Sequence, residues 1–129
     1  MISVCQDCLS NGATIVPILT ASDKTPVTRM TGGLEMHPLF VSIANIPGHI
    51  RMAASSYAWR CVAFMPIPKF DVPAANQAIL QARIVHKCID IVTEGLKRVT
   101  ETGSFMVDPH GHLRYCFTPL AAWTADLPE

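Results

Sequence analysis

The stretch from Ala13 to Thr25, ATIVPILTASDKT, decides the fold. Its first part carries no charge and contains Ile, Val and Leu, which predicts a strand buried on both faces of a sheet. The run ends at Asp23, and Lys24 and Thr25 follow directly. In open α/β folds, ligands and metals bind where strands leave the sheet at their carboxyl ends. Asp23 is therefore the first candidate site residue.

Length and composition limit the possible classes of protein. The 129 residues suffice for one domain with one core, and an apolar share of 50% excludes disorder over most of the length. Ten basic residues balance ten acidic ones, so no net basic field holds DNA without sequence preference. No apolar run approaches a membrane span of about 18 residues, and no leader is evident. We expect a soluble, intracellular protein with no membrane partner.

Two further strands are predicted before the sequence changes period. Residues 39–46 alternate between two faces and end at Pro47, and residues 57–65 are rich in aromatic and β-branched side chains. Pro66 and Pro68 close the second of these runs. With short turns between them, the three strands predict an antiparallel meander.

A long helix is predicted over residues 74–102, which contain no proline. Its apolar residues recur at steps of four and three, which places them on one helical face. These residues are Ala78, Ala82, Val85, Ile89, Val92, Leu96 and Val99. Asp71 is expected to cap the start of the helix, and Gly103 to end it. Packing of this face on the chain's own sheet is favoured over a coiled coil.

After the helix, residues 104–116 predict a hairpin that turns at residues 108–111, and residues 119–126, PLAAWTAD, predict a buried strand that ends on Asp126. Three strands, a helix and a strand are the element order of the ribonuclease H-like α/β fold, in which the last of these strands lies parallel to and beside the first. Asp23 and Asp126 would then meet at one end of the sheet. Two facing carboxylates are typical of a pair of Mg²⁺ or Mn²⁺ ions about 3.5–4 Å apart.

The five cysteines are expected to be reduced thiols, because no secretory signal precedes them. Cys5 and Cys8 form a CxxC pair, which needs two more ligands to close a zinc site. His110, His112 and Cys116 are the candidates, but their spacing matches no zinc ribbon or finger. Incidental thiols are the favoured interpretation, and a small zinc-binding structural protein stays an alternative.

Several spaced motifs carry a family resemblance. They are residues 13–19, Ser22-Asp23-Lys24-Thr25, residues 42–47 followed by Arg51, and residues 125–129. Together they resemble the serial motifs of Plavaka-type transposases, DNA transposon proteins abundant in mushroom-forming fungi and related to the wider DDE/D group. The resemblance covers residues 12–129 and leaves residues 1–12 as a polar lead-in.

The resemblance implies a ribonuclease H-like core that cuts and joins DNA ends in the nucleus. It implies Asp23 and Asp126 as the first and second metal-binding acids, with Mg²⁺ or Mn²⁺ as cofactor and DNA as partner. Lys24 matches the motif and is expected to be solvated, and Asn45 and Pro47 are expected to form a turn rather than to contact DNA.

The chain also departs from the family pattern. Ala125 and Leu127 stand where the family shows Gly and Tyr, and the third acid is expected on a helix further downstream. Glu129 lies too close to Asp126 to replace it. We therefore expect residues 13–129 to be the N-terminal part of a core truncated after the second acidic motif, inactive by itself and binding DNA weakly or not at all.

The last strand offers a different interpretation. If nothing pairs outside residues 119–126, this apolar strand becomes an exposed edge. We expect it to promote self-association, and a non-catalytic protein-binding module that uses this edge is the alternative function.

Overall fold

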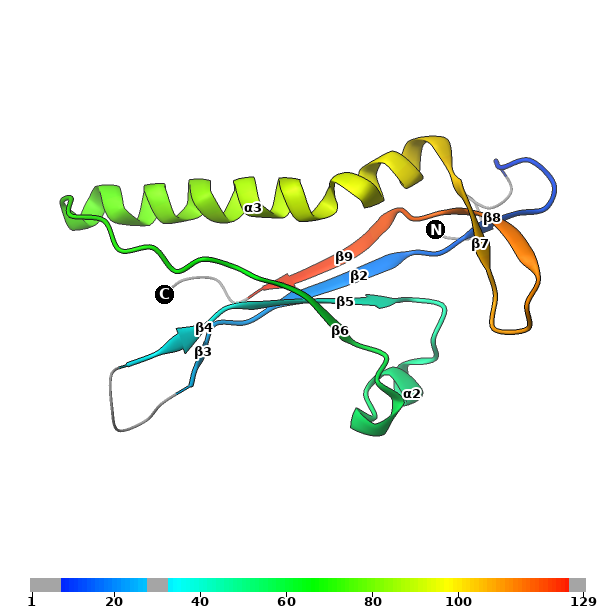
Figure 1. Cartoon of the computed structure of the whole chain (residues 1–129), viewed down its shortest axis with the longest axis horizontal. Coiled ribbons are helices and arrows are strands. Elements are labelled where there is room, and N and C mark those ends of the chain that lie inside the picture. Colours follow the sequence, from blue (N-terminus) through cyan, green and yellow to red (C-terminus); the bar gives the residue numbers. More distant parts are fainter. Residues whose placement is uncertain (1–7, 28–32, 126–129) are drawn as a thin grey trace.

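The computed structural model describes residues 8–27 and 33–125 as a mixed α/β structure with one long helix (Figure 1). The elements are β1 (Ala13–Ile15), β2 (Ile18–Ser22), β3 (Thr25–Pro26), β4 (Glu35–Met36), β5 (Pro38–Ile43), α2 (Gly48–Arg51), the 3-10 helix η1 (Ala54–Ser56), β6 (Arg60–Phe64), α3 (Ala74–Thr102), β7 (Ser104–Val107), β8 (Leu113–Phe117) and β9 (Leu120–Ala125).

The central sheet has the strand order β6-β5-β2-β9. β2 pairs antiparallel with β5, and β5 pairs antiparallel with β6, so the predicted meander is confirmed. β9 pairs parallel with β2, which confirms the predicted placement of the strand after the helix. The third strand starts later than predicted, at Arg60, because Tyr57 is left-handed rather than extended and closes the 3-10 helix before it.

The predicted first strand is divided in two at Pro17, which has no N–H to donate to a ladder. β1 pairs parallel with β8 in a second, three-stranded sheet, and β2 continues beside β9. Two hydrogen bonds bridge the division: Val16 N donates to Phe117 O at 2.8 Å, and Ile18 N donates to Pro119 O at 2.8 Å. The segment β1–β2 therefore runs parallel to the segment β8–β9 through both sheets. We call this pair of segments the ribbon.

Burial along this ribbon is one-sided. Ala13, Ile15, Ile18, Thr20 and Ser22 are buried, whereas the residues between them are mostly half-buried. The prediction of burial on both faces is therefore wrong. All six residues of β9 are exposed, so the buried character predicted for the last strand is also wrong. β9 is the edge of the sheet within the described residues, as expected for an unpartnered last strand.

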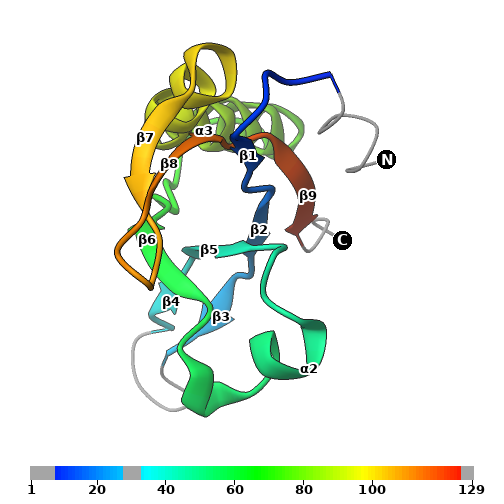
Figure 2. The ribbon, with the colours of Figure 1, turned by 90° about the vertical axis from the view of Figure 1, so that its right-hand side faces the viewer.

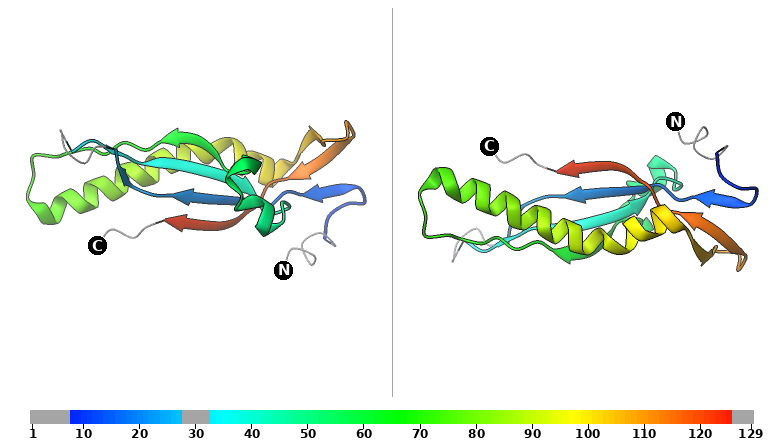
Figure 3. Two further views of the ribbon diagram at one scale, coloured as in Figure 1. Left: turned by 90° about the horizontal axis from the view of Figure 1, so that it is seen from below. Right: turned by 90° about the horizontal axis from the view of Figure 1, so that it is seen from above.

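The long helix has the predicted bounds and lies along one face of the sheet (Figures 1 and 3). Its start is capped by Pro73 without a side-chain hydrogen bond, so the predicted Asp71 cap is wrong. No residue of α3 is fully buried, and Ala78 and Ala82 of the predicted apolar face are exposed. A groove of about 160 Å³ remains between α3 and the sheet, lined by Leu96 and Trp123 among others. The helix thus covers the sheet loosely.

Gly103 ends α3 as predicted, with a φ of 71°. A Cβ at this position would lie 2.6 Å from Cζ of Tyr115, so a side chain is also excluded by close approach. The Tyr115 hydroxyl donates to the carbonyl of Thr102, which ties the hairpin β7–β8 to the end of the helix.

The segment that joins β5 to β6 lies on the other side of the sheet. α2 and η1 are on the face opposite α3, as two perpendicular views show (Figures 1 and 2). Within the described ranges, no helix has the length and apolar character to cross a membrane.

Candidate functional site

The two predicted acids follow neighbouring strands. Asp23 comes directly after Ser22, the last residue of β2, and Ala125 is the last residue of β9. Ser22 pairs with Ala125 in the parallel register. Because parallel strands have their carboxyl ends at the same end of a sheet, the segments that follow β2 and β9 start side by side (Figure 1). Asp126 is the next residue in the sequence, but it lies outside the described residues.

A bulge in the β2–β9 ladder sets this register. Ile18 pairs with Leu120, but Leu19 pairs with Ala122, so Ala121 is an extra residue. Without it, Ser22 would face Thr124. Thr20 is 1% exposed, and its hydroxyl donates to the carbonyl of Ala122 at 3.2 Å, directly beside the extra residue. Nothing in the sequence pattern had indicated the bulge.

Asp23 is exposed and weakly engaged. Its Oδ2 accepts a hydrogen bond from the Thr25 hydroxyl at 3.5 Å. The neighbouring Lys24 is not simply solvated as predicted, because its amine forms an ion pair with Glu35 at 2.8 Å. Among the described residues, no cation forms a salt bridge with Asp23.

A second contact fixes the strand end that carries Asp23. Ser22 is 7% exposed, and its Oγ lies 2.7 Å from Nε2 of His37, the residue before β5. Burial and the positive charge of Lys24 lower the pKa of His37, and Asp23 opposes this shift. Sequence reasoning missed both Glu35 and His37, because their role depends on pairing with residues more than ten positions away.

The contacts of the motif over residues 42–47 and of Arg51 hold the backbone together. Nδ2 of Asn45 donates to the carbonyl of Ile15 at 3.2 Å, which joins the turn after β5 to β1. Nη1 of Arg51 donates to the carbonyl of Ile46 at 3.0 Å. Ser42 is 4% exposed, and its Oγ has no hydrogen-bond partner within the part of the chain that the structure describes.

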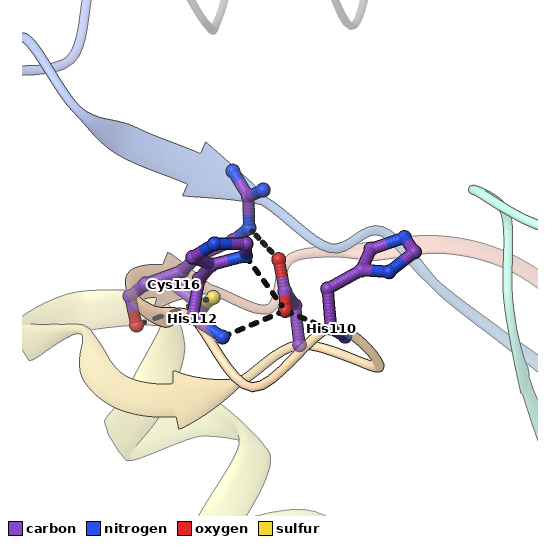
Figure 4. Close-up of polar contacts among 5 residues, drawn as sticks. His110, His112 and Cys116 are labelled. Carbon is purple, nitrogen blue, oxygen red and sulfur yellow. Dashed lines mark hydrogen bonds and ion pairs between the residues drawn. The ribbon is translucent and has the colours of Figure 1, made fainter.

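The turn between β7 and β8 carries His110 and His112 (Figure 4) and is organised by Asp108. Its Oδ1 accepts hydrogen bonds from the backbone N–H groups of His110 and His112, each at 2.9 Å. Its Oδ2 accepts from Nε of Arg114 at 2.8 Å. The backbone N–H groups, first that of His112, and the Arg114 side chain lower the pKa of Asp108. The histidines are therefore turn residues, as their positions predicted.

Within the described residues, the candidate ligands of the alternative zinc site do not come together as a metal site. Cys5 lies outside the described residues, Cys8 is exposed, and Cys116 is buried with its thiol 3.7 Å from the carbonyl of Arg114. The rings of His110 and His112 are 6.4 Å apart. Over residues 8–27 and 33–125, no group of three or more His, Cys, Asp or Glu side chains could hold a metal ion.

Comparison with known proteins gives one family. A family model described as Plavaka transposase matches residues 2–129. Neither the curated proteins nor the solved structures gave a match. Since the match spans nearly the whole sequence, including the motifs at Asp23 and Asp126, the chain belongs to the Plavaka transposase family.

Proposed function

We propose that this chain is part of a ribonuclease H-like transposase core that cuts and joins DNA with the help of divalent cations. In this proposal, Asp23 and Asp126 hold the cation at the end of the sheet where β2 and β9 have their carboxyl ends. The observation that carries the proposal is the parallel pairing of these strands, with Ser22 opposite Ala125. Membership of a transposase family supports DNA as the substrate. We expect such an enzyme to act in the nucleus.

The chemistry of Asp23 fits Mg²⁺ or Mn²⁺. Both ions prefer carboxylate oxygens, and two nearby carboxylates repel each other unless a cation lies between them. Asp23 is exposed, and the adjacent Lys24 is occupied by Glu35. When bound, such a cation polarises a phosphoryl oxygen and activates the attacking water or hydroxyl. This chain contributes the carboxylates, and the Ser22–His37 contact holds the strand end that presents one of them.

The strand arrangement supports the ribonuclease H-like assignment. A meander, a long helix and a hairpin come before a strand that lies parallel to the first. Residues 13–129 form this part of the core in the proposal. Two carboxylates supply only part of the ligands of a two-metal site, so we expect cation binding by this chain without measurable DNA cleavage.

The test is to titrate Mn²⁺ into isotope-labelled protein and follow paramagnetic broadening of its amide signals. We expect the broadening to centre on residues 22–25. Asp23→Asn and Asp126→Asn should each weaken binding at least tenfold. If both acids hold one cation, the losses caused by the two substitutions should be non-additive in the double variant, because the two carboxylates act at a shared site.

Asp71→Asn is the matched control, because Asp71 is exposed and precedes α3 rather than β2 or β9. This variant should bind Mn²⁺ like the parent chain. Undiminished binding in the Asp23, Asp126 double variant, or broadening centred on Asp90 or Asp108, would contradict the proposal.

A second function, protein binding by strand addition, is favoured by one observation. All six residues of β9 are exposed, and β9 has no neighbour on its outer side within the described sheet. An exposed edge of this kind can pair with a strand of another chain or of a second copy. This function needs no metal. Binding of a partner strand should therefore be unchanged by substitution of Asp23 or Asp126, which distinguishes it from the first function.

A further inference from the structure

A pocket of about 210 Å³ lies in the segment between α2 and β6. Arg51, Tyr57 and Trp59 provide its large side chains, and alanines and Met52 complete the wall. The segment starts after Ile43, which pairs with Ile18 at the beginning of β2, whereas Asp23 follows the other end of β2. The pocket is therefore remote from the proposed metal site. The helix α2, which contributes Arg51 to it, lies on the face of the sheet opposite α3 (Figure 2).

The side chains of the pocket are those that stack on flat rings. Tyr57 is 72% exposed, and Trp59 is half-buried beside it in the sequence. Nη1 of Arg51 donates to the carbonyl of Ile46, which fixes the guanidinium group at the pocket and leaves its other N–H groups free to bind. Aromatic rings and guanidinium planes are the usual platforms for unpaired nucleobases.

The backbone at Tyr57 is strained. Its φ of 51° and ψ of 28° are left-handed, and it is the one residue other than glycine with positive φ in the described ranges. It closes η1, a position where glycine avoids the steric cost. Strained residues cluster at binding and catalytic sites, because a functional contact outweighs the local cost. A large exposed ring held in this conformation indicates that the ring itself has a use.

The charge around the pocket favours a phosphate-bearing ligand. Residues 36–70 contain no Asp or Glu, although the whole chain has ten acidic residues. Of its basic residues, Arg51 lines the pocket, His49 is on the same helix α2, and Arg60 starts β6 directly after Trp59. The overall charge balance thus hides a local excess of positive charge. Such a surface attracts the nucleic acid backbone and repels basic peptides.

We propose that this pocket binds an unpaired nucleobase of single-stranded DNA. The base stacks on Tyr57 and Trp59, and Arg51 contacts its ring or the adjoining phosphate. A base inside a duplex cannot enter unless it is first unstacked, so the pocket selects single strands, frayed ends or extruded bases. The inference goes beyond the proposed metal chemistry and needs neither Asp23 nor a cation.

The test measures binding of fluorescently labelled oligothymidine of about 20 nucleotides by anisotropy, in EDTA and at low salt. A duplex of the same length is measured in parallel. Trp123→Phe leaves Trp59 as the one tryptophan, since the chain has two, and we expect its emission to be quenched by the bound base. Tyr57→Ala should weaken single-strand binding about 5- to 150-fold, the loss typical of one stacking partner.

Tyr57→Gly separates loss of binding from loss of folding. Glycine tolerates the left-handed conformation, so this variant should keep or raise the unfolding midpoint while binding falls as in Tyr57→Ala. Phe64→Ala is the matched control, because Phe64 is an aromatic residue on β6 that is 65% exposed and does not line the pocket. It should leave binding unchanged.

Four results would overturn the inference. They are no detectable single-strand binding, equal affinity for the duplex, unchanged affinity in Tyr57→Gly, and an equal loss in Phe64→Ala. The measurement in EDTA distinguishes this inference from the proposed function, because no divalent cation is then available to the proposed metal site. A failed Mn²⁺ titration therefore has no bearing on single-strand binding or on the quenching of Trp59.

Discussion

Replacing Ser22 by alanine should loosen the strand end that carries Asp23. The hydroxyl is 7% exposed and lies 2.7 Å from Nε2 of His37, so its removal leaves a half-buried imidazole nitrogen without its partner. A lost hydrogen bond costs about 0.5–1.5 kcal/mol, and an unsatisfied partner adds to that cost. We expect the free energy of unfolding to fall by about 1–2 kcal/mol, which lowers the unfolding temperature by about 3–6 °C in a domain of this size.

The assay is a double-mutant cycle of Ser22→Ala and His37→Ala, followed by urea unfolding. If the contact stabilises the strand end, the two effects should be non-additive by about 1 kcal/mol. Because the pKa of His37 is lowered on folding, the unfolded state binds more protons below the ordinary value of 6.5. Stability from this site should therefore be complete above that pH and fall as the pH drops toward the lowered pKa. Additive effects, together with identical pH profiles in parent and His37→Ala proteins, would refute this reasoning.

Three other predictions concern the hairpin, the helix end and the sheet edge. The Asp108 carboxyl should titrate below its ordinary pKa, so its contribution to the stability of the turn is complete above that value and is lost as the pH falls through the lowered one. A carbon-detected NMR titration checks this, and a normal pKa would contradict it. Gly103→Ala should lower the free energy of unfolding by about 1–3 kcal/mol, because φ is positive and the new Cβ meets Tyr115. Gly95→Ala, in open space within α3, should raise it by about 1 kcal/mol. Equal effects of the two substitutions in thermal unfolding would reject this account. Size-exclusion chromatography should show concentration-dependent self-association, and Thr124→Lys should reduce it by placing a charge on the edge strand β9. A monomer at every concentration would count against self-association through β9.

Much of the architecture could be predicted because it is encoded locally. The four-and-three spacing fixed the bounds of α3, and turn residues located the hairpin between β7 and β8. The placement of β9 followed from element order rather than from its own residues. Its burial could not be predicted from apolar character, because an edge strand and a central strand have the same composition.

The candidate site was only partly accessible from sequence. Asp23 could be proposed from sequence because it directly follows an apolar run, and the strand pairing places Ser22, the residue before it, opposite Ala125. Glu35 and His37 were missed because their contacts join segments that no sequence period relates. The extra residue Ala121 was missed for the same reason, since a bulge depends on the partner strand.

The ribbon formed by β1–β2 and β8–β9 has a consequence for how the protein assembles. Leu19 pairs with Ala122, so nearly the whole chain lies between two residues that must become neighbours. Closing a loop of that length costs about 4 kcal/mol of chain entropy, which the intervening meander and helix reduce if they form first. On the ribosome, β2 can pair with β9 only after β9 has been made. Pulse-labelled hydrogen exchange should show protection in α3 before protection in β9, and the reverse order would contradict this sequence of events.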